Sequence, residues 1–268
     1  MTIKHIFSDM DGTLLDTSGS VTKENIALIK KAAIPLTLVS ARAPMEMRRA
    51  RKELGLTQTQ IAFNGGLIYR ALDDLIQVKI ARPIAAKTTR YLLNYLDLNF
   101  PDVSQSYYDV ATWYSAKMDR GIEYESQITL EFPTIISTKT YLEPTQDIFK
   151  IMLITFEEET MQKLLEDLNA LGLDDITIQR SGPYHLEITH HEAKKSAGID
   201  YILREEQLKK EETAGFGDGH NDLPMFEKVG VAIAMDNALP QIKQKADHIT
   251  LSNDQSGVGK GIWQYLKA

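Results

Sequence analysis

Two aspartates, Asp9 and Asp11, stand one residue apart in the stretch DMDGTLLD, directly after a short apolar run. Side chains at this spacing point the same way while the backbone stays extended. Two neighbouring carboxylates repel each other, so the pair has to serve a cation or a reaction. Together with the polar groups that follow other predicted elements, the pair suggests phosphoryl transfer, with Asp9 as the nucleophile. Asp11 would protonate the leaving alcohol and then take a proton from the attacking water.

Further polar groups follow other predicted elements. Ser40 comes after an apolar run, Asp218 ends the run TAGFG, and Lys195 begins a predicted helix. Because the carboxyl ends of parallel strands meet at one sheet edge, we expect these groups to gather there. Ser40 and Lys195 would hold phosphoryl oxygens, Asp218 would complete a metal shell, and Asp222 would orient Lys195 or a metal-bound water. Crowded carboxylates without cysteine or a histidine cluster favour Mg²⁺.

The elements that position these groups alternate along both ends of the chain. Thr22 is predicted to cap a helix that runs to about Ala33, and Pro44 and Gly55 are predicted to bound the next helix. Predicted strands cover residues 3–7, 34–39, 61–63, 213–217, 231–235 and 248–251. Strands alternating with helices indicate an α/β fold with a doubly wound parallel sheet.

The middle of the chain has a different pattern. We predict helices at 85–98 and 157–171, an exposed antiparallel stretch at 104–115, and strands at 150–156, 176–178 and 185–188. These elements indicate a separate α+β unit. Within it, the aromatic residues Tyr107, Tyr108, Trp113 and Tyr114 are expected to pack. The sequence therefore predicts a core from residues 1–82 and 188–268, with an inserted domain at 83–187.

Four segments together resemble the motifs of the haloacid dehalogenase superfamily: Asp9 to Leu15, Val39 to Arg42, Lys195, and Gly217 to Asp222. The insert resembles the C2B cap of the Cof-type phosphatases of subfamily IIB. Two further stretches, NGG at 64–66 and MDNA at 235–238, resemble Cof-type signatures. The resemblance implies a Rossmann-like core, a cap that closes over the site, and phosphatase activity.

The resemblance also implies roles for individual residues. Asp9 would be the phosphorylated nucleophile and Asp11 the general acid and base, with Ser40 and Lys195 completing the catalytic set. Mg²⁺ would be held by Asp9, the backbone carbonyl of Asp11, and Asp218. The expected substrate contacts are Gly12, Arg42, Asn64 and Asn221, and Asp222 has a supporting role.

The chain departs from the family pattern at several positions. Ala41 replaces the usual glycine of the second motif, and Glu192 stands where the third motif usually has glycine, adding an acid near the anion site. Asp236 also occupies a position where glycine is common. Lys194 and Lys195 compete for the lysine of the third motif, and the spacing favours Lys195.

Composition narrows the function. The 268 residues carry a formal net charge of −7, which argues against general affinity for nucleic acid or anionic membranes. There is no cysteine, so disulfides and thiolate metal sites are excluded. No signal peptide or apolar run of about 20 residues is visible. We expect a cytoplasmic protein, either a monomer or a weak dimer.

The sequence thus predicts a Mg²⁺-dependent phosphatase of a small phosphorylated metabolite, acting through an aspartyl-phosphate intermediate. Sugar phosphates are the favoured substrate class, by resemblance only, and flavin or pyridoxal phosphates are alternatives. Two other functions stay open at this point. A phosphomutase would use the same pair of aspartates but return the phosphoryl group to the sugar. A non-catalytic binding or signalling protein would carry a long-lived phosphate on Asp9.

Overall fold

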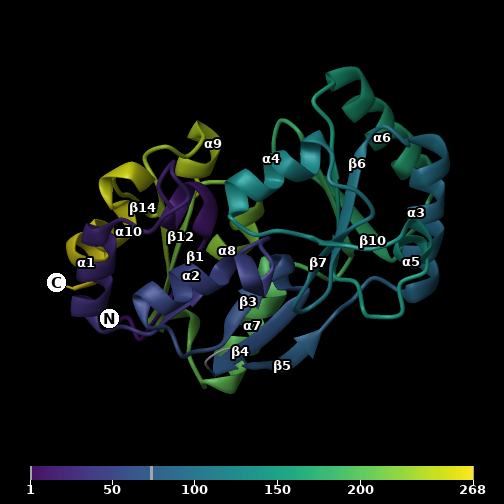
Figure 1. The fold of residues 1–268 in the computed structure, drawn as a ribbon. Helices are drawn as coiled ribbons and strands as arrows, with labels where there is room; N and C mark the ends of the chain where they lie inside the picture. The colour runs from purple at the N-terminus through teal and green to yellow at the C-terminus, as the bar shows by residue number, and fades with distance from the viewer. Residues whose placement is uncertain (1, 73–74, 268) are drawn as a thin grey trace. The chain divides into compact units, whose positions relative to one another are not determined.

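The structure, a computed structural model, describes residues 2–72 and 75–267. Its contacts divide the chain into two compact units (Figure 1). The first unit contains Met1–Arg42, Met47–Ile80 and Lys194–Ala268, and the second contains Ala43–Glu46 and Ala81–Ala193. Both ends of the chain therefore belong to the first unit. The borders predicted for a core and an inserted domain stay a prediction.

The first unit is built on a five-stranded parallel sheet with the strand order β14-β13-β12-β1-β2. The order changes direction between β12 and β1, which is the position where open α/β sheets bind ligands. The strand bounds are His5–Ser8 for β1, Leu36–Leu38 for β2, Thr213–Gly217 for β12, Val231–Ala234 for β13 and His248–Ile249 for β14.

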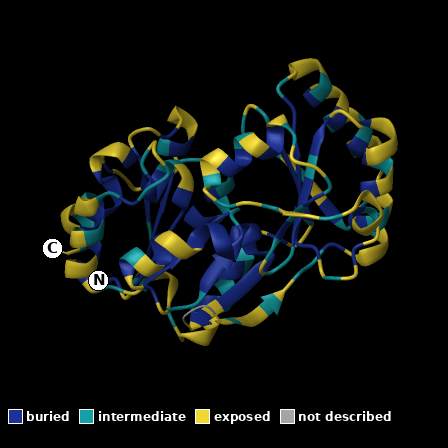
Figure 2. Ribbon diagram, in the orientation of Figure 1, coloured by how far each residue is buried: buried dark blue, intermediate teal, exposed yellow. Residues whose placement is uncertain are grey.

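Helices accompany this sheet, and Figure 2 shows β1, β12 and most of β13 dark blue and the outer helix surfaces yellow. Ile199 and Ile202 of α7 and Met225 of α8 pack with Phe7 of β1 in one apolar cluster, while α1 contacts α10. Thr22 caps α1 by accepting the Asn25 N–H, as predicted. The helix bounds are Lys23–Ala32 (α1), Pro44–Leu54 (α2), Lys195–Glu205 (α7), Leu223–Phe226 (α8), Pro240–Lys243 (α9) and Gly257–Gly261 (α10).

The predicted strand 61–63 belongs to a different sheet from the one expected. The stretch 61–63 contributes to β3 (Gln60–Ala62), which pairs antiparallel with β4 (Leu67–Leu72) in a separate sheet that also contains β5 (Leu75–Ala81). A single bridge from Val39 to Ile61 links it to the parallel sheet. Phe63 and Asn64 follow with φ of 50° and 54°, so the chain turns back instead of continuing the parallel pattern.

The second unit contains a six-stranded sheet with the order β10-β11-β9-β6-β7-β8, antiparallel except for the pair β7–β8. Apolar residues of α3 and α6 form one cluster with residues of β9 and β11. The bounds are Ala86–Asn99 (α3), Ser104–Tyr108 (β6), Trp113–Ser115 (β7), Arg120–Thr129 (α4), Thr134–Ile135 (β8), Thr138–Leu142 (α5), Lys150–Ile154 (β9), Glu158–Ala170 (α6), Ile176–Arg180 (β10) and His185–His190 (β11).

The predicted exposure of the stretch 104–115 is wrong, whereas the expected packing of its aromatic residues inside the unit is confirmed. Tyr107, Tyr108 and Trp113 are at most 1% exposed. The reason is packing against the faces of the sheet: Tyr107 lies in the apolar cluster and stacks on Tyr141 of α5 at 4.8 Å, and the rings of Tyr108 and Trp113 stack on each other at 5.6 Å. The α/β fold class is otherwise confirmed, with a parallel sheet in one unit and a mixed sheet in the unit inserted between its segments. Among the described residues, none of the helices combines the length and apolarity that a membrane crossing requires.

Candidate active site

The acidic pair lies at the end of β1, beside the point where the strand order reverses. Asp9 follows Ser8, its N–H donates to the carbonyl of Phe216, and an irregular turn spans Met10–Leu14. Gly12 within this turn has φ of +74°, and a Cβ there would lie 2.4 Å from Oδ2 of Asp218. Only glycine fits such a close approach, so the turn brings the first acidic motif directly against the last one.

Lys195 joins two acids from different parts of the chain. Its Nζ lies 2.5 Å from Oδ1 of Asp9 and 2.7 Å from Oδ1 of Asp222, and its side chain is buried. Oδ2 of Asp222 accepts the backbone N–H groups of Asp218 and Gly219, both at 3.0 Å. Asp222 therefore has protein partners on both oxygens and orients Lys195. Lys194 is exposed, so the structure places Lys195, of the two candidates, at the site.

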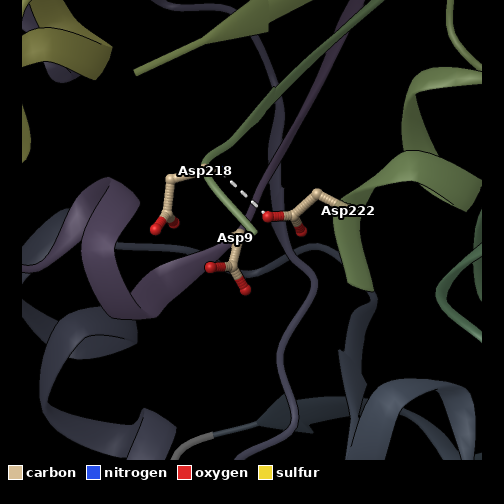
Figure 3. A group of neighbouring side chains, drawn as sticks. All are labelled: Asp9, Asp218 and Asp222. Atoms are coloured by element: carbon tan, nitrogen blue, oxygen red, sulfur yellow. Dashed lines mark hydrogen bonds between the residues drawn. The ribbon is translucent and has the colours of Figure 1, made fainter. Parts of the chain in front are cut away.

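Three carboxyl groups converge at this edge of the sheet. One oxygen from each of Asp9, Asp218 and Asp222 lies within 4.8 Å of the others, and Figure 3 shows the three side chains grouped together. Thr13 donates its hydroxyl hydrogen to Oδ1 of Asp218 at 2.7 Å. Because Asp222 already has partners on both oxygens, Asp9 and Asp218 are the acids best placed to bind a cation.

Burial and mutual repulsion disfavour the ionised form of two acids in this cluster. Burial raises the pKa of Asp9 well above its ordinary value, and the charge of Asp222 adds to the increase, while Lys195 opposes it. Burial also raises the pKa of Asp218, to about 6, although the hydrogen bond from Thr13 lowers it. For Lys195, burial acts to lower the pKa, but the charges of Asp222 and Asp9 outweigh it and raise the pKa. A hard divalent cation would supply the missing charge, so the acids fit a metal site.

Arg42 donates two parallel hydrogen bonds from its guanidinium group to the Asp11 carboxylate. Nε of Arg42 lies 2.8 Å from Oδ2 of Asp11, and Nη2 of Arg42 lies 2.7 Å from Oδ1. The Asp11 side chain is 58% exposed, whereas that of Arg42 is 12% exposed. Such a two-pronged pair fixes the carboxylate plane. The structure therefore places Arg42, predicted as a substrate contact, as an orienting partner of Asp11.

The other predicted residues lie at the same edge. Ser40 is buried, and its hydroxyl oxygen accepts the Arg42 N–H at 3.1 Å. The Asn64 N–H donates to the Ser40 carbonyl at 2.8 Å, and the residue has φ of 54°. Asn221 is half-buried in a short 3₁₀ turn, His220–Asp222, which begins two residues after Asp218. All of these residues belong to the first unit.

The positions that depart from the family pattern carry ordinary contacts. Glu192 belongs to the second unit and lies 3.5 Å from the Nε of Arg82. Asp236 is exposed and pairs with Lys243 at 3.0 Å. Neither contact removes a group from the acidic cluster.

Sequence reasoning missed two residues of the site. Thr13 binds Asp218, and Asn237 donates its side-chain N–H to the Gly12 carbonyl at 2.7 Å. Both lie inside stretches that the sequence singles out as motifs. The sequence does not show which atoms those side chains reach, because their partners lie 205 and 225 positions away along the chain.

Comparison with known proteins decides the family. The model of the haloacid dehalogenase-like hydrolases matches residues 6–262. The chain belongs to this family. A 5-amino-6-(5-phospho-D-ribitylamino)uracil phosphatase of Bacillus subtilis (strain 168) is 27% identical, over 98% of this chain and 96% of the relative. The family and its relatives make the chain a haloacid dehalogenase-like phosphatase, which is a phosphoric monoester hydrolase.

Solved structures show the same architecture. A haloacid dehalogenase-like hydrolase from Bacteroides thetaiotaomicron superposes with a TM-score of 0.89 at 24% identity, over 98% of this chain and 99% of the other. A sugar phosphatase of haloacid dehalogenase subclass IIB superposes with a TM-score of 0.80 at 20% identity, covering 98% of both chains. The chain therefore has the fold of the Cof-type IIB phosphatases, with a parallel core sheet and an inserted cap.

Proposed function

We propose that this phosphatase hydrolyses a small phosphorylated metabolite in a Mg²⁺-dependent reaction through a phosphoaspartate on Asp9. The observation that carries the proposal is the contact of Asp9 with Lys195, which Asp222 holds from the other side. Lys195 therefore orients the Asp9 carboxyl group at the reversal point of a parallel sheet, where a nucleophile would face the ligand-binding edge.

The reaction has two steps. In the first, a carboxylate oxygen of Asp9 forms a bond to phosphorus, the bond from phosphorus to the ester oxygen breaks, and Asp11 gives its proton to the leaving oxygen. In the second, Asp11 takes a proton from water, whose oxygen attacks phosphorus and releases inorganic phosphate and the Asp9 carboxylate. Lys195 and the Ser40 hydroxyl would stabilise the charge on the phosphoryl oxygens.

Asp9 and Asp218, with the backbone carbonyl of Asp11, are the residues that would hold Mg²⁺. When bound, the cation would neutralise carboxylate charge and stabilise charge that develops on the phosphoryl group. The raised pKa values of both acids support this assignment, since each acid is poorly compensated by the protein alone.

A phosphorylated sugar or sugar alcohol is the substrate class that we propose. The Bacillus subtilis relative is named for a substrate with a phosphorylated ribityl chain, which is a phosphate ester of a polyol. The match to this relative covers nearly all of both chains and so includes both units of this protein.

Release of inorganic phosphate from a panel of sugar, polyol, nucleotide, flavin and pyridoxal phosphates tests the proposal. We expect release in Mg²⁺, loss of release in EDTA, and loss in Asp9→Asn. Asp200→Asn is the matched control, because Asp200 forms a surface ion pair with Lys228 and its side chain is 41% exposed. Isomerisation of a sugar phosphate without phosphate release, or a Mg²⁺-dependent reaction that survives Asp9→Asn, would contradict the proposal.

A further inference from the structure

The side chain of Asn237 connects two loops that flank the nucleophile. Its Nδ2 donates to the Gly12 carbonyl at 2.7 Å, and its Oδ1 accepts the Asn253 N–H at 3.0 Å. Asn253 in turn donates its own side-chain N–H to the Leu15 carbonyl at 2.9 Å. Two amide side chains from the C-terminal part of the chain therefore hold the middle and the C-terminal end of the turn that follows Asp9.

The Gly12 peptide is the part of this turn that most needs to be held. On one side, the position of its missing Cβ is closed by Asp218, at 2.4 Å. The next residue, Thr13, donates to Asp218 at 2.7 Å. Asn237 holds the carbonyl oxygen of the same peptide. A rotation of the Gly12 peptide would therefore move Asp9 and Asp11 relative to Asp218.

We propose that Asn237 is a positioning residue for the phosphatase reaction, and that it acts by fixing the Gly12 carbonyl and so the spacing between Asp9, Asp11 and Asp218. The proposal rests on the proposed function, because it assumes that these acids carry the reaction. Asn237 itself contacts neither the nucleophile nor, in the reaction as written, the phosphoryl group.

Because Asn237 is exposed, its effect on the rate can be measured apart from its effect on the stability of the fold. Asn237 is exposed, so water can replace its hydrogen bonds when the side chain is changed, and the fold loses little. Catalysis is more sensitive, because a misplacement of about 1 Å can lower a rate by about 10²-fold. A substitution at Asn237 should therefore lower kcat far more than it lowers thermal stability.

Two variants of Asn237 distinguish a residue that positions the Gly12 carbonyl from one that only ties two loops together. Asn237→Asp keeps an oxygen that can accept the Asn253 N–H but loses the donor to Gly12 and brings a carboxylate against its carbonyl oxygen. Asn237→Ala loses both contacts. If Asn237 only ties the loops together, the alanine variant should lose more kcat than the aspartate variant. If Asn237 positions the Gly12 carbonyl, the aspartate variant should lose at least as much kcat as the alanine variant.

The experiment measures kcat, KM and the melting temperature for both variants, with the best phosphate ester from the panel as substrate. Asp236→Asn is the control, since Asp236 is the exposed neighbour and pairs with Lys243. We expect Asn237→Asp to lower kcat by about 10- to 100-fold with KM within about threefold of wild type. The melting temperature should change by only a few degrees, and Asp236→Asn should match the wild type.

Three results would overturn the inference. They are wild-type kcat in Asn237→Asp, a loss of kcat in Asn237→Ala that exceeds the loss in Asn237→Asp, and a loss of kcat that follows the melting temperature across both variants. Failure of the wild type itself to release phosphate would instead count against the proposed function, so the two failures are distinguishable.

Discussion

Lys195 in the first unit and Lys150 in the second are each about 2% exposed, and each lies between two carboxylates. Nζ of Lys195 lies 2.5 and 2.7 Å from its two acids. Nζ of Lys150 lies 3.9 Å from Glu46 and 4.0 Å from Glu187. Contacts at hydrogen-bond distance fix the direction of a carboxylate, whereas contacts near 4 Å balance charge without doing so.

The difference in distance between the two lysines indicates two uses of a buried lysine: to orient carboxylates or to balance their charge. At the Lys195 site, each acid has to point in one direction, because one is the proposed nucleophile and the other receives two backbone N–H groups. The ammonium group of Lys150 lies over the Tyr108 ring, 4.5 Å from its centroid. Glu46 accepts the Ala43 N–H at 2.6 Å and so stabilises the start of α2. We therefore expect the first cluster to control rate and the second to control stability.

The largest expected effect is the loss of activity in Lys195→Met. The variant leaves Asp9 and Asp222 without their shared cation, and we expect kcat to fall by about 10³-fold. Phosphate release under saturating Mg²⁺ measures the effect. Lys194→Met is the matched control, because Lys194 is the exposed neighbour in the sequence. Equal losses in the two variants would contradict the assignment of Lys195.

The pH dependence of the metal-free protein should be the next largest effect. The pKa of Asp218 is raised to about 6, so the folded state binds protons more tightly than the unfolded state. The contribution of Asp218 to stability is therefore highest below about pH 4 and falls as pH rises through 6. In EDTA, we expect Asp218→Asn to raise the melting temperature at pH 7 and to leave it nearly unchanged at pH 4. A lower melting temperature for Asp218→Asn than for the wild type at pH 7 in EDTA would contradict this prediction.

Lys150→Met should lower stability more than rate. Removing one member of a buried hydrogen-bonded ion pair costs about 3–5 kcal/mol, and the longer distances at Lys150 suggest about 2 kcal/mol. Denaturant unfolding measures the loss, and hydrolysis of a small chromogenic phosphate should stay within about threefold of the wild type. If kcat falls as far as in Lys195→Met at an unchanged unfolding free energy, the two clusters do not divide rate from stability.

Glu187→Gln should have the smallest effect of the series. Glutamine keeps the shape of the side chain, and Glu46 still balances the charge of Lys150, so we expect a loss below about 1 kcal/mol. Glu227→Gln, which changes an exposed acid, is the control for loss of charge alone. A loss several times larger at Glu187 would show that this acid, and not Glu46, is the main partner of Lys150.

The sequence predicted the bounds of single helices and strands well, but it predicted less well which elements pack against each other. The helix from Pro44 to the residue before Gly55 follows from two local preferences, and the structure has it at Pro44–Leu54. The burial of Tyr107 in the stretch 104–115 depends on Tyr141 of α5, which comes later in the chain and stacks on its ring at 4.8 Å. The stretch mixes serine, glutamine and aromatic residues without a regular alternation, so the packing and not the sequence decides which side chains are buried.

The candidate site divides in the same way. The types and order of Asp9, Asp11, Lys195 and Asp218 were enough to predict that one sheet edge gathers acids and a lysine. The roles proposed for these residues still await their tests. The contact between Arg42 and Asp11 was not predicted, because it depends on side-chain directions that the sequence does not specify.

The sequence by itself determined the fold class, the family motifs and the acidic character of the site, because strand ends, turn residues and spacing are local properties of the chain. Only the tertiary structure decided that Lys195 and not Lys194 meets Asp9, that Asp222 is occupied by backbone N–H groups, and that Asn237 holds Gly12. The physical reason is that each of these contacts joins side chains and backbone whose relative directions are fixed only when the strands pack into one sheet.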